Sequence, residues 1–140
     1  MNREELMDLF SERIRELLVR LPVDYEEVQE IRLRAEKPLL IRYGTGEYFV
    51  TGEGTLSKEE SKGFLVDKKE LMETMEYIAN YSLYAYEEEL KQGYLTVRGG
   101  HRIGVAGKII MDGNRISSVR YISFLNVRLS HERKGCADPI

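Results

Sequence analysis

The first twenty-one residues carry the pattern of an amphipathic helix. Between Asn2 and Leu21, apolar residues recur at intervals of three and four positions, and charged residues fill the opposite face. Pro22 follows directly, and proline has no N–H with which to continue a helix. The pattern predicts a helix over residues 2–21 whose apolar stripe packs against the domain's own sheet.

The next segment alternates as strands do. Residues 30–34 place apolar and charged side chains in strict alternation, which is typical of a half-buried strand. A turn at Pro38 and a second turn rich in glycine separate two further short apolar runs. We therefore expect strands over 30–50. Residues 51–65 are polar and contain three glycines, so we expect a mobile loop there.

A second helical region and a second group of strands follow. Asp67 and Glu70 have the spacing of a capping box, which predicts helices within 67–92, interrupted near residue 81. Strands are expected over 94–129, with a glycine pair at 99–100 and Asp112-Gly113 as turns. Helix, strands, helices and strands in that order predict an α+β fold with a largely antiparallel sheet.

Composition limits the class of protein. The 140 residues suit a single domain, and 42% hydrophobic with 32% charged residues is the balance of a globular chain. A lone cysteine excludes an internal disulfide, and one cysteine with two histidines falls short of the four Cys/His ligands of a structural zinc site. No apolar run approaches the length of a membrane span, and the charged amino terminus lacks a signal-peptide core. We expect a cytoplasmic protein.

The net charge of −3 conceals a division along the chain. Residues 1–93 hold 13 Lys/Arg against 21 Asp/Glu, whereas residues 94–140 hold 8 against 3. A basic carboxyl-terminal third can face phosphate, an acidic protein surface or nucleic acid. The alternative is that the two parts neutralise each other within the fold.

The chain shows no catalytic set. It lacks the GxxxxGK[ST] phosphate loop, HExxH, GxSxG and CxxC, so we expect no enzymatic activity from these residues. Arginines on strands are the remaining candidates, because planar guanidinium groups recognise phosphate and carboxylate. Arg32 and Arg34 share a strand face, Arg98 and Arg102 flank the glycine pair, and Arg128 ends the last strand. The alternative is that they pair with acidic helices or coat a polar sheet face.

Several blocks of sequence resemble the stage III sporulation protein AA family. The resemblance runs from Val28 to the end of the chain, and the blocks stand in the family's order: 30–34 with 37–39, 78–90 with 92–94, 99–104, 123–128 and 134–138.

The resemblance implies a secretion ATPase of endospore-forming bacteria, similar to the motors of type II and type IV secretion and pilus retraction. Such proteins join an N-terminal α+β domain to a RecA-like P-loop domain, use ATP and Mg²⁺, and act as hexamers. The chain is then the N-terminal domain alone, with the RecA-like domain expected after residue 140. The motor is expected in the mother cell, at the forespore outer membrane, beneath a channel built by membrane proteins of the same operon.

The pilus-retraction motors also suggest roles for residues. Residues 31–34, Pro38 and 39–44 resemble their strand, turn and second strand ending Arg-x-x-Gly, which implies a PAS-like fold. In those motors, arginines of the N-terminal domain reach nucleotide phosphates. The nearest positional counterpart is Arg102, although Gly104 departs from the motor pattern, and the further candidates are Arg98, Arg32, Arg34 and Arg128.

The sequence thus predicts a non-catalytic domain that mediates subunit and partner contacts and lends arginines toward nucleotide phosphates. The alternative is a nucleic-acid-binding module that uses the basic carboxyl-terminal strands, with Tyr94 and Tyr121 as a stacking surface. An isoelectric point near 5.5 and the lack of a binding motif count against it. A third possibility is a pure oligomerisation domain whose arginines touch no ligand.

Overall fold

The computed structural model describes residues 2–81, 86–113 and 115–131. Its helices are α1 (Arg3–Met7), α2 (Glu12–Arg20), α3 (Lys68–Asn80) and α4 (Tyr86–Lys91), with 3-10 turns η1 (Tyr25–Glu27) and η2 (Glu60–Lys62). The strands are β1 (Val28–Arg34), β2 (Lys37–Pro38), β3 (Leu40–Tyr43), β4 (Gly46–Val50), β5 (Leu56–Ser57), β6 (Leu65–Val66), β7 (Tyr94–Thr96), β8 (Arg102–Asp112) and β9 (Arg115–Arg128).

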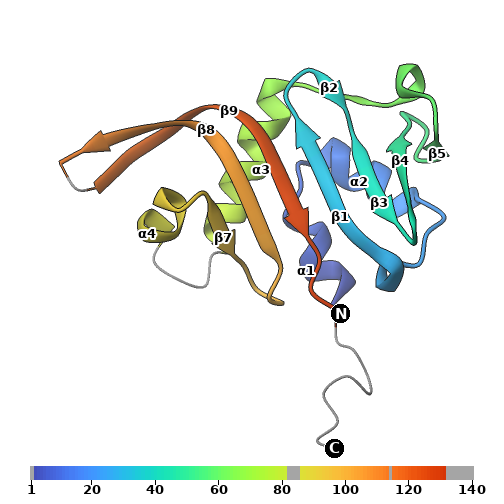
Figure 1. Cartoon of the computed structure of the whole chain (residues 1–140), viewed down its shortest axis with the longest axis horizontal. Helices are drawn as coiled ribbons and strands as arrows, with labels where there is room; N and C mark the ends of the chain where they lie inside the picture. Colours follow the sequence, from blue (N-terminus) through green and yellow to red (C-terminus); the bar gives the residue numbers. More distant parts are fainter. Residues whose placement is uncertain (1, 82–85, 114, 132–140) are drawn as a thin grey trace, which may run out of the picture.

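A seven-stranded antiparallel sheet organises the molecule. Its strand order is β5-β4-β3-β1-β9-β8-β7, and β2 and β6 form a separate two-stranded sheet. Figure 1 shows α1, α2 and α3 behind the large sheet, with the β8–β9 hairpin extending past it at one side. The predicted α+β class with a largely antiparallel sheet is confirmed.

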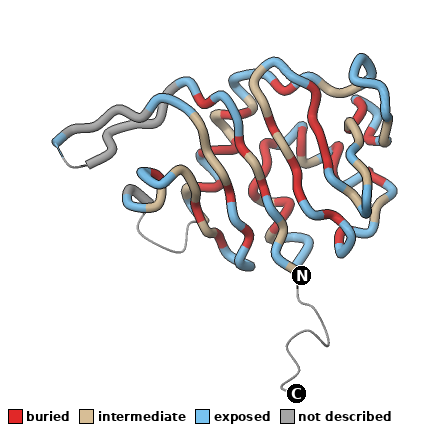
Figure 2. Tube along the Cα trace, in the orientation of Figure 1, coloured by how far each residue is buried: buried red, intermediate tan, exposed pale blue. Residues whose placement is uncertain are grey.

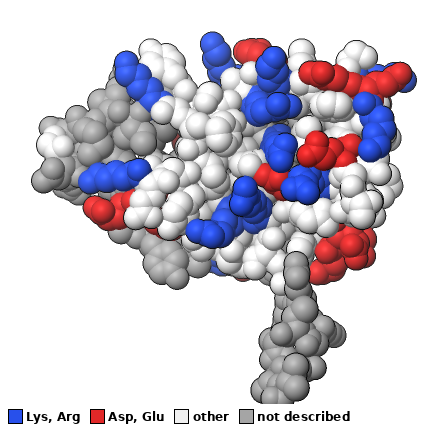
Figure 3. Space-filling model, viewed as in Figure 1, with Lys and Arg blue, Asp and Glu red and all other residues white. Residues whose placement is uncertain are grey.

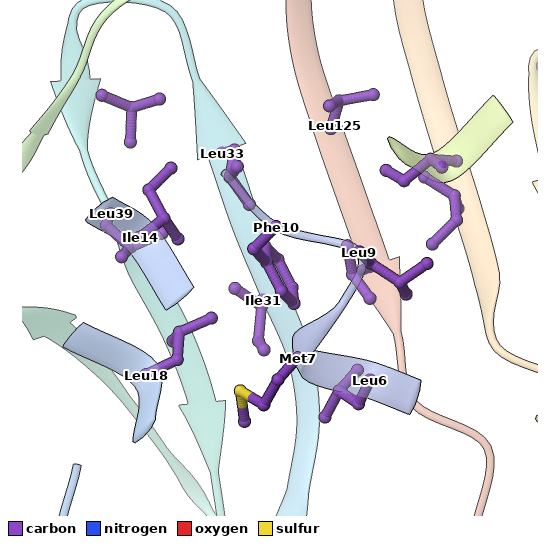
Figure 4. Close-up of a cluster of buried hydrophobic side chains, with 14 of the residues drawn as sticks. Leu6, Met7, Leu9, Phe10, Ile14, Leu18, Ile31, Leu33, Leu39 and Leu125 are labelled. Atoms are coloured by element: carbon purple, nitrogen blue, oxygen red, sulfur yellow. The ribbon is translucent and has the colours of Figure 1, made fainter. Parts of the chain in front are cut away.

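One hydrophobic core lies between the helices and the sheet. Leu6 and Phe10 from the amino-terminal segment meet Ile31 and Leu33 of β1, with Leu125 of β9 beside them (Figure 4). All five side chains are fully buried. Figure 2 shows buried residues recurring along the central strands, as expected when one sheet face is covered by helices, although in β1 the adjacent residues Glu30 and Ile31 are both buried.

The predicted single helix over residues 2–21 is wrong, because the structure divides it into α1 and α2. Arg15 reaches back across the break, where Nε donates to the Met7 carbonyl at 3.1 Å and Nη2 to the Phe10 carbonyl at 3.0 Å. The Ser11 N–H donates to Thr74 Oγ1 of α3 at 3.1 Å. These bonds satisfy backbone groups that the break exposes, so the turn is stable without a continuous helix.

The predicted loop over residues 51–65 is also wrong, because the segment is organised by hydrogen bonds. It contains β5 and η2 and returns to the sheet, where the Phe64 N–H donates to the Val50 carbonyl at 2.7 Å. The Leu39 N–H donates to the Phe64 carbonyl at 2.8 Å. Thr51, at the start of the segment, is buried. The polar residues of this segment thus form hydrogen-bonded turns and a short strand, and not an irregular loop.

The predicted helices and glycine turns are found where the structure describes them. Asp67 and Glu70 form the reciprocal capping box that begins α3. Gly93 ends α4 with a φ of +87°, and Gly99 and Gly100 turn the chain with φ values of +90° and +82°. Residues 82–85 of the predicted helical region and the sequence block 134–138 lie outside the described residues.

Candidate functional site

The sheet face opposite the helices carries most of the candidate arginines. Cross-strand register places Glu30 of β1 between Arg42 of β3 and Arg128 of β9, and it pairs Arg128 with Arg102 of β8. Figure 3 shows Lys and Arg side chains gathered across the middle of this face, with acidic side chains among them toward one end. We call this surface the open face and define it by Glu30, Arg32, Arg34, Arg42, Glu47, Tyr94, Arg102, Gly104, Phe124, Asn126 and Arg128.

A nearly buried carboxylate lies at the centre of the open face. The Glu30 side chain is only 5% exposed, and Arg32 Nη2 donates to its Oε2 at 3.1 Å. Arg42 Nη1 lies 3.7 Å from the same oxygen, and Arg128 Nε lies 3.8 Å from Oε1. Because a buried carboxylate is costly without opposite charge, these guanidinium groups offset the cost of burying Glu30 in the sheet surface.

Positive charge exceeds negative charge on the open face. Glu47 joins the cluster at 3.7 Å from Arg32 and 3.9 Å from Arg42. The cluster therefore contains two carboxylates and three guanidinium groups, which leaves one positive charge in excess. Arg102 has no carboxylate partner among the described residues. The surplus charge makes this face attractive to an anion.

A hollow of about 320 Å³ opens beside the cluster. Gly104 lies between Tyr94 and Asn126 in cross-strand register and contributes no side chain, so the space above it stays open. The guanidinium of Arg102 lies 4.8 Å from the centre of the Tyr94 ring. The lining comprises Tyr94, Arg102, Gly104, Phe124, Asn126 and Arg128.

The hollow offers positive charge from two adjacent strands. Asn126 Oδ1 is buried in it with no hydrogen-bond partner among the described residues, and as an acceptor this atom suits a donor group of a ligand and not an anionic oxygen. Arg102 and Arg128 are directly opposite each other, and the Arg128 side chain is 72% exposed. Like charges opposed on neighbouring strands repel, and an anion held between them would remove that repulsion. The arrangement is therefore chemically suited to phosphate or carboxylate oxygens.

The structure brings four of the five predicted arginines to this face and separates the fifth. Arg32, Arg34, Arg102 and Arg128 lie on it, whereas Arg98 lies beyond the end of β7 with its guanidinium 5.6 Å from the Tyr81 ring centre. Arg98 lines a small cleft together with acidic residues of the first helical segment, Glu5 and Asp8.

Arg42 and the two carboxylates, Glu30 and Glu47, were not among the residues predicted for the site. Arg42 and Glu47 flank a tight turn between β3 and β4 and pair directly across it. The glycine-rich sequence at residues 44–46 predicted that turn. The pairing of Arg42 with Glu30 depends on the register of β1 against β3, which alternation alone does not set.

A second hollow, of about 400 Å³, differs in character. It lies beside α3 and β9, is mainly apolar, and is lined by Ala35, Lys68, Met72, Tyr121, Ile122 and Ser123. Tyr121 therefore lines a different hollow from Tyr94. The stacking surface that the sequence suggested for these two tyrosines is not formed as a single site.

Comparison with known proteins places the chain among sporulation proteins. The family described as Sporulation stage III, protein AA matches residues 1–140. Stage III sporulation protein AA of Bacillus subtilis (strain 168) is 33% identical over 138 residues, which is 97% of this chain and 41% of that protein. The chain thus spans about two fifths of this curated relative. No solved structure matches.

Proposed function

The chain belongs to the sporulation stage III protein AA family, and on that premise we propose that its open face binds nucleotide phosphates within a secretion ATPase. In this proposal the chain is a non-catalytic N-terminal domain, and a RecA-like domain elsewhere in the protein holds the nucleotide. The observation that carries the proposal is the surplus of guanidinium groups on the open face, where Arg102 has no carboxylate partner among the described residues and Arg128 is exposed.

The residues present fit phosphate but not the whole nucleotide site. Guanidinium groups donate two parallel hydrogen bonds to phosphate oxygens, and Arg102 and Arg128 can approach a ligand from adjacent strands. The sequence has no GxxxxGK[ST] loop, so the phosphate loop and Mg²⁺ ligands belong to the RecA-like domain in this proposal. Bound ATP and Mg²⁺ supply the phosphoryl-transfer chemistry, and this chain's arginines orient the domain on the phosphates.

Phosphate contacts of this kind would couple nucleotide state to domain position. A domain that contacts the nucleotide through a few guanidinium groups can move as a rigid body when the phosphates are hydrolysed or released. We propose that this motion acts within a homo-oligomer, a hexamer by resemblance, and on membrane proteins of the same sporulation operon. The place of action proposed is the mother-cell cytoplasm at the forespore outer membrane. The structure shows no helix, among the residues it describes, with the length and hydropathy to cross a bilayer.

The test is ATP hydrolysis by the complete gene product. Arg102→Ala should lower the rate by about a hundredfold, because the guanidinium that orients the domain on the phosphates is lost. Arg98→Ala is the matched control, since Arg98 lies against Tyr81 and away from the open face. Equal hydrolysis by the wild type and Arg102→Ala would overturn the role proposed for Arg102.

The nucleic-acid alternative has one observation in its favour, the Tyr94 and Phe124 side chains that line the arginine-bearing hollow. The isoelectric point near 5.5 and the separation of Tyr121 from Tyr94 favour nucleotide phosphates instead. Binding of single-stranded RNA that weakens with salt and with Arg102→Ala, without any effect of that variant on hydrolysis, would favour the alternative.

A further inference from the structure

We infer that Glu30 is an internal counter-anion that competes with the ligand for Arg128, and that the open face therefore selects polyphosphate groups over a single phosphate. The inference rests on the proposed function, because it concerns the same arginines and names the class of anion they take. It adds a role for a carboxylate that does not itself touch the ligand.

The Glu30 cluster has a tightly held side and a loosely held side. Arg32 is only 34% exposed and donates a hydrogen bond to Glu30 Oε2 at 3.1 Å. Arg128 is 72% exposed and approaches Oε1 at 3.8 Å, which is too long for a hydrogen bond. Glu30 Oε1 is accordingly buried with no hydrogen-bond partner in the part of the chain that the structure describes. Of the arginines around Glu30, Arg128 can therefore turn away from the carboxylate with the smallest loss of interaction energy.

The Arg128 side chain also has a second position available, toward the hollow that it lines together with Arg102. It is directly opposite Arg102, and side chains in that relation start about 5 Å apart at Cβ. Both residues line the same hollow, whereas Arg32 does not. A guanidinium that turns from Glu30 toward the hollow joins Arg102 around one anion, and the same movement weakens its attraction to the buried carboxylate.

The competition sets which anion binds. Glu30 stays in place with its negative charge, so a ligand must attract Arg128 more strongly than this carboxylate does and must also overcome repulsion from it. A single phosphate provides one anionic centre for two guanidinium groups. Adjacent phosphates in a chain provide one anionic centre for each of the two guanidinium groups. A diphosphate or triphosphate group therefore gains more binding free energy from Arg102 and Arg128 than orthophosphate does.

The experiment is a calorimetric titration of the 140-residue chain with inorganic tripolyphosphate and with orthophosphate at low salt. Wild type should bind tripolyphosphate more tightly than orthophosphate. Glu30→Gln keeps the shape of the side chain and removes its charge, so it should tighten tripolyphosphate binding about fivefold.

Two control variants separate this effect from a general change in charge. Glu47→Gln removes a carboxylate of the open face that contacts Arg32 and Arg42, and among the described residues no ion pair joins Glu47 to Arg128. It should therefore tighten tripolyphosphate binding clearly less than Glu30→Gln does, by about twofold at most. In an Arg128→Ala background only the repulsion between Glu30 and the ligand remains, so Glu30→Gln should tighten binding much less than it does when Arg128 is present. Equal tightening by both Gln variants, or the full effect of Glu30→Gln in the absence of Arg128, would overturn the inference.

A measurement on the wild type keeps the inference testable if Glu30→Gln does not fold. Tripolyphosphate should shift the side-chain Nε–H resonance of Arg128 and leave that of Arg32 in place. An unchanged Arg128 resonance in the saturated protein would contradict the inference. The two proposals fail differently: if the wild type does not bind tripolyphosphate, the phosphate-binding function fails, whereas binding that needs Arg128 but ignores Glu30 removes only the counter-anion role.

Discussion

Arg102 and Arg128 lie directly opposite each other on β8 and β9, with like charges on adjacent strands of the uncovered sheet face. The Tyr94 ring centre lies 4.8 Å from the Arg102 guanidinium, and Glu30 Oε1 lies 3.8 Å from Arg128 Nε. A protein that keeps two such groups together loses stability unless an anion joins them. This pair is therefore the central feature of the proposed function.

Replacement of Arg102 by Gln should stabilise the free chain while weakening its binding of phosphate. The repulsion with Arg128 disappears, so the free energy of unfolding should rise by about 0.5 kcal/mol at low salt. The gain should shrink at high salt, where the repulsion is already screened. Urea denaturation at two salt concentrations measures both effects, and a loss of stability at low salt would contradict the account.

The break between α1 and α2 should depend on one hydroxyl group. Thr74 is fully buried, and its Oγ1 accepts the Ser11 N–H. Thr74→Val leaves that donor buried without a partner and should lower the free energy of unfolding by about 2 kcal/mol. Thr74→Ser retains the hydroxyl and should lose less. Equal losses in chemical denaturation would show that the methyl group, not the hydrogen bond, is what matters.

Two neighbouring glycines should respond differently to alanine. Gly54 has a φ of +77°, and a Cβ there would lie 2.7 Å from Arg20 Cβ, so Gly54→Ala should cost about 2 kcal/mol of stability. A Cβ on Gly52 meets nothing within 4 Å, and Gly52→Ala should stay within about 0.5 kcal/mol of wild type. Thermal unfolding of both variants checks the difference, which would be absent if the segment were the irregular loop that its composition predicts.

Stability should fall as the pH drops below neutrality because of His101. Burial, followed by the nearby His131, lowers the pKa of His101 below its ordinary value, and Nδ1 accepts the Ser130 N–H at 3.0 Å. Below about pH 6.5 the unfolded chain binds a proton that folded His101 resists, so this contribution to stability is complete above that pH and is lost as the pH falls.

His101→Asn tests the pH dependence. The asparagine side-chain oxygen can accept the Ser130 N–H, but asparagine does not titrate. When the pH is lowered from about 7.5 to about 5.5, values on the two sides of the ordinary histidine pKa, the variant should therefore lose less stability than wild type. Urea denaturation at the two pH values makes the comparison. The same loss in both proteins would assign the effect to another group.

The sequence predicted the strands of the site better than the helical segment that covers them. Strict alternation in β1 correctly put Arg32 and Arg34 on one face, because alternation follows from strand geometry alone. Alternation could not show that Arg42 and Arg128 converge on Glu30, since that requires the register of three strands.

The helix break was unpredictable for a related reason. Leu9 and Phe10 are buried within the break itself, so apolar spacing continues across it without interruption. The break is held by Thr74, which lies 63 residues away from Ser11 in the chain. Arg98 shows the same limit, since its separation from Arg102 results from the turn at Gly99 and Gly100 rather than from any difference in residue type.

The most direct test of phosphate binding by the open face is a titration of the 140-residue chain with tripolyphosphate, repeated with Arg102→Ala and Arg128→Ala. The account predicts binding by the wild type that weakens as salt rises, and at least about a tenfold loss of affinity in each variant. Dissociation constants equal in all three proteins, or no binding by the wild type at low salt, would contradict it.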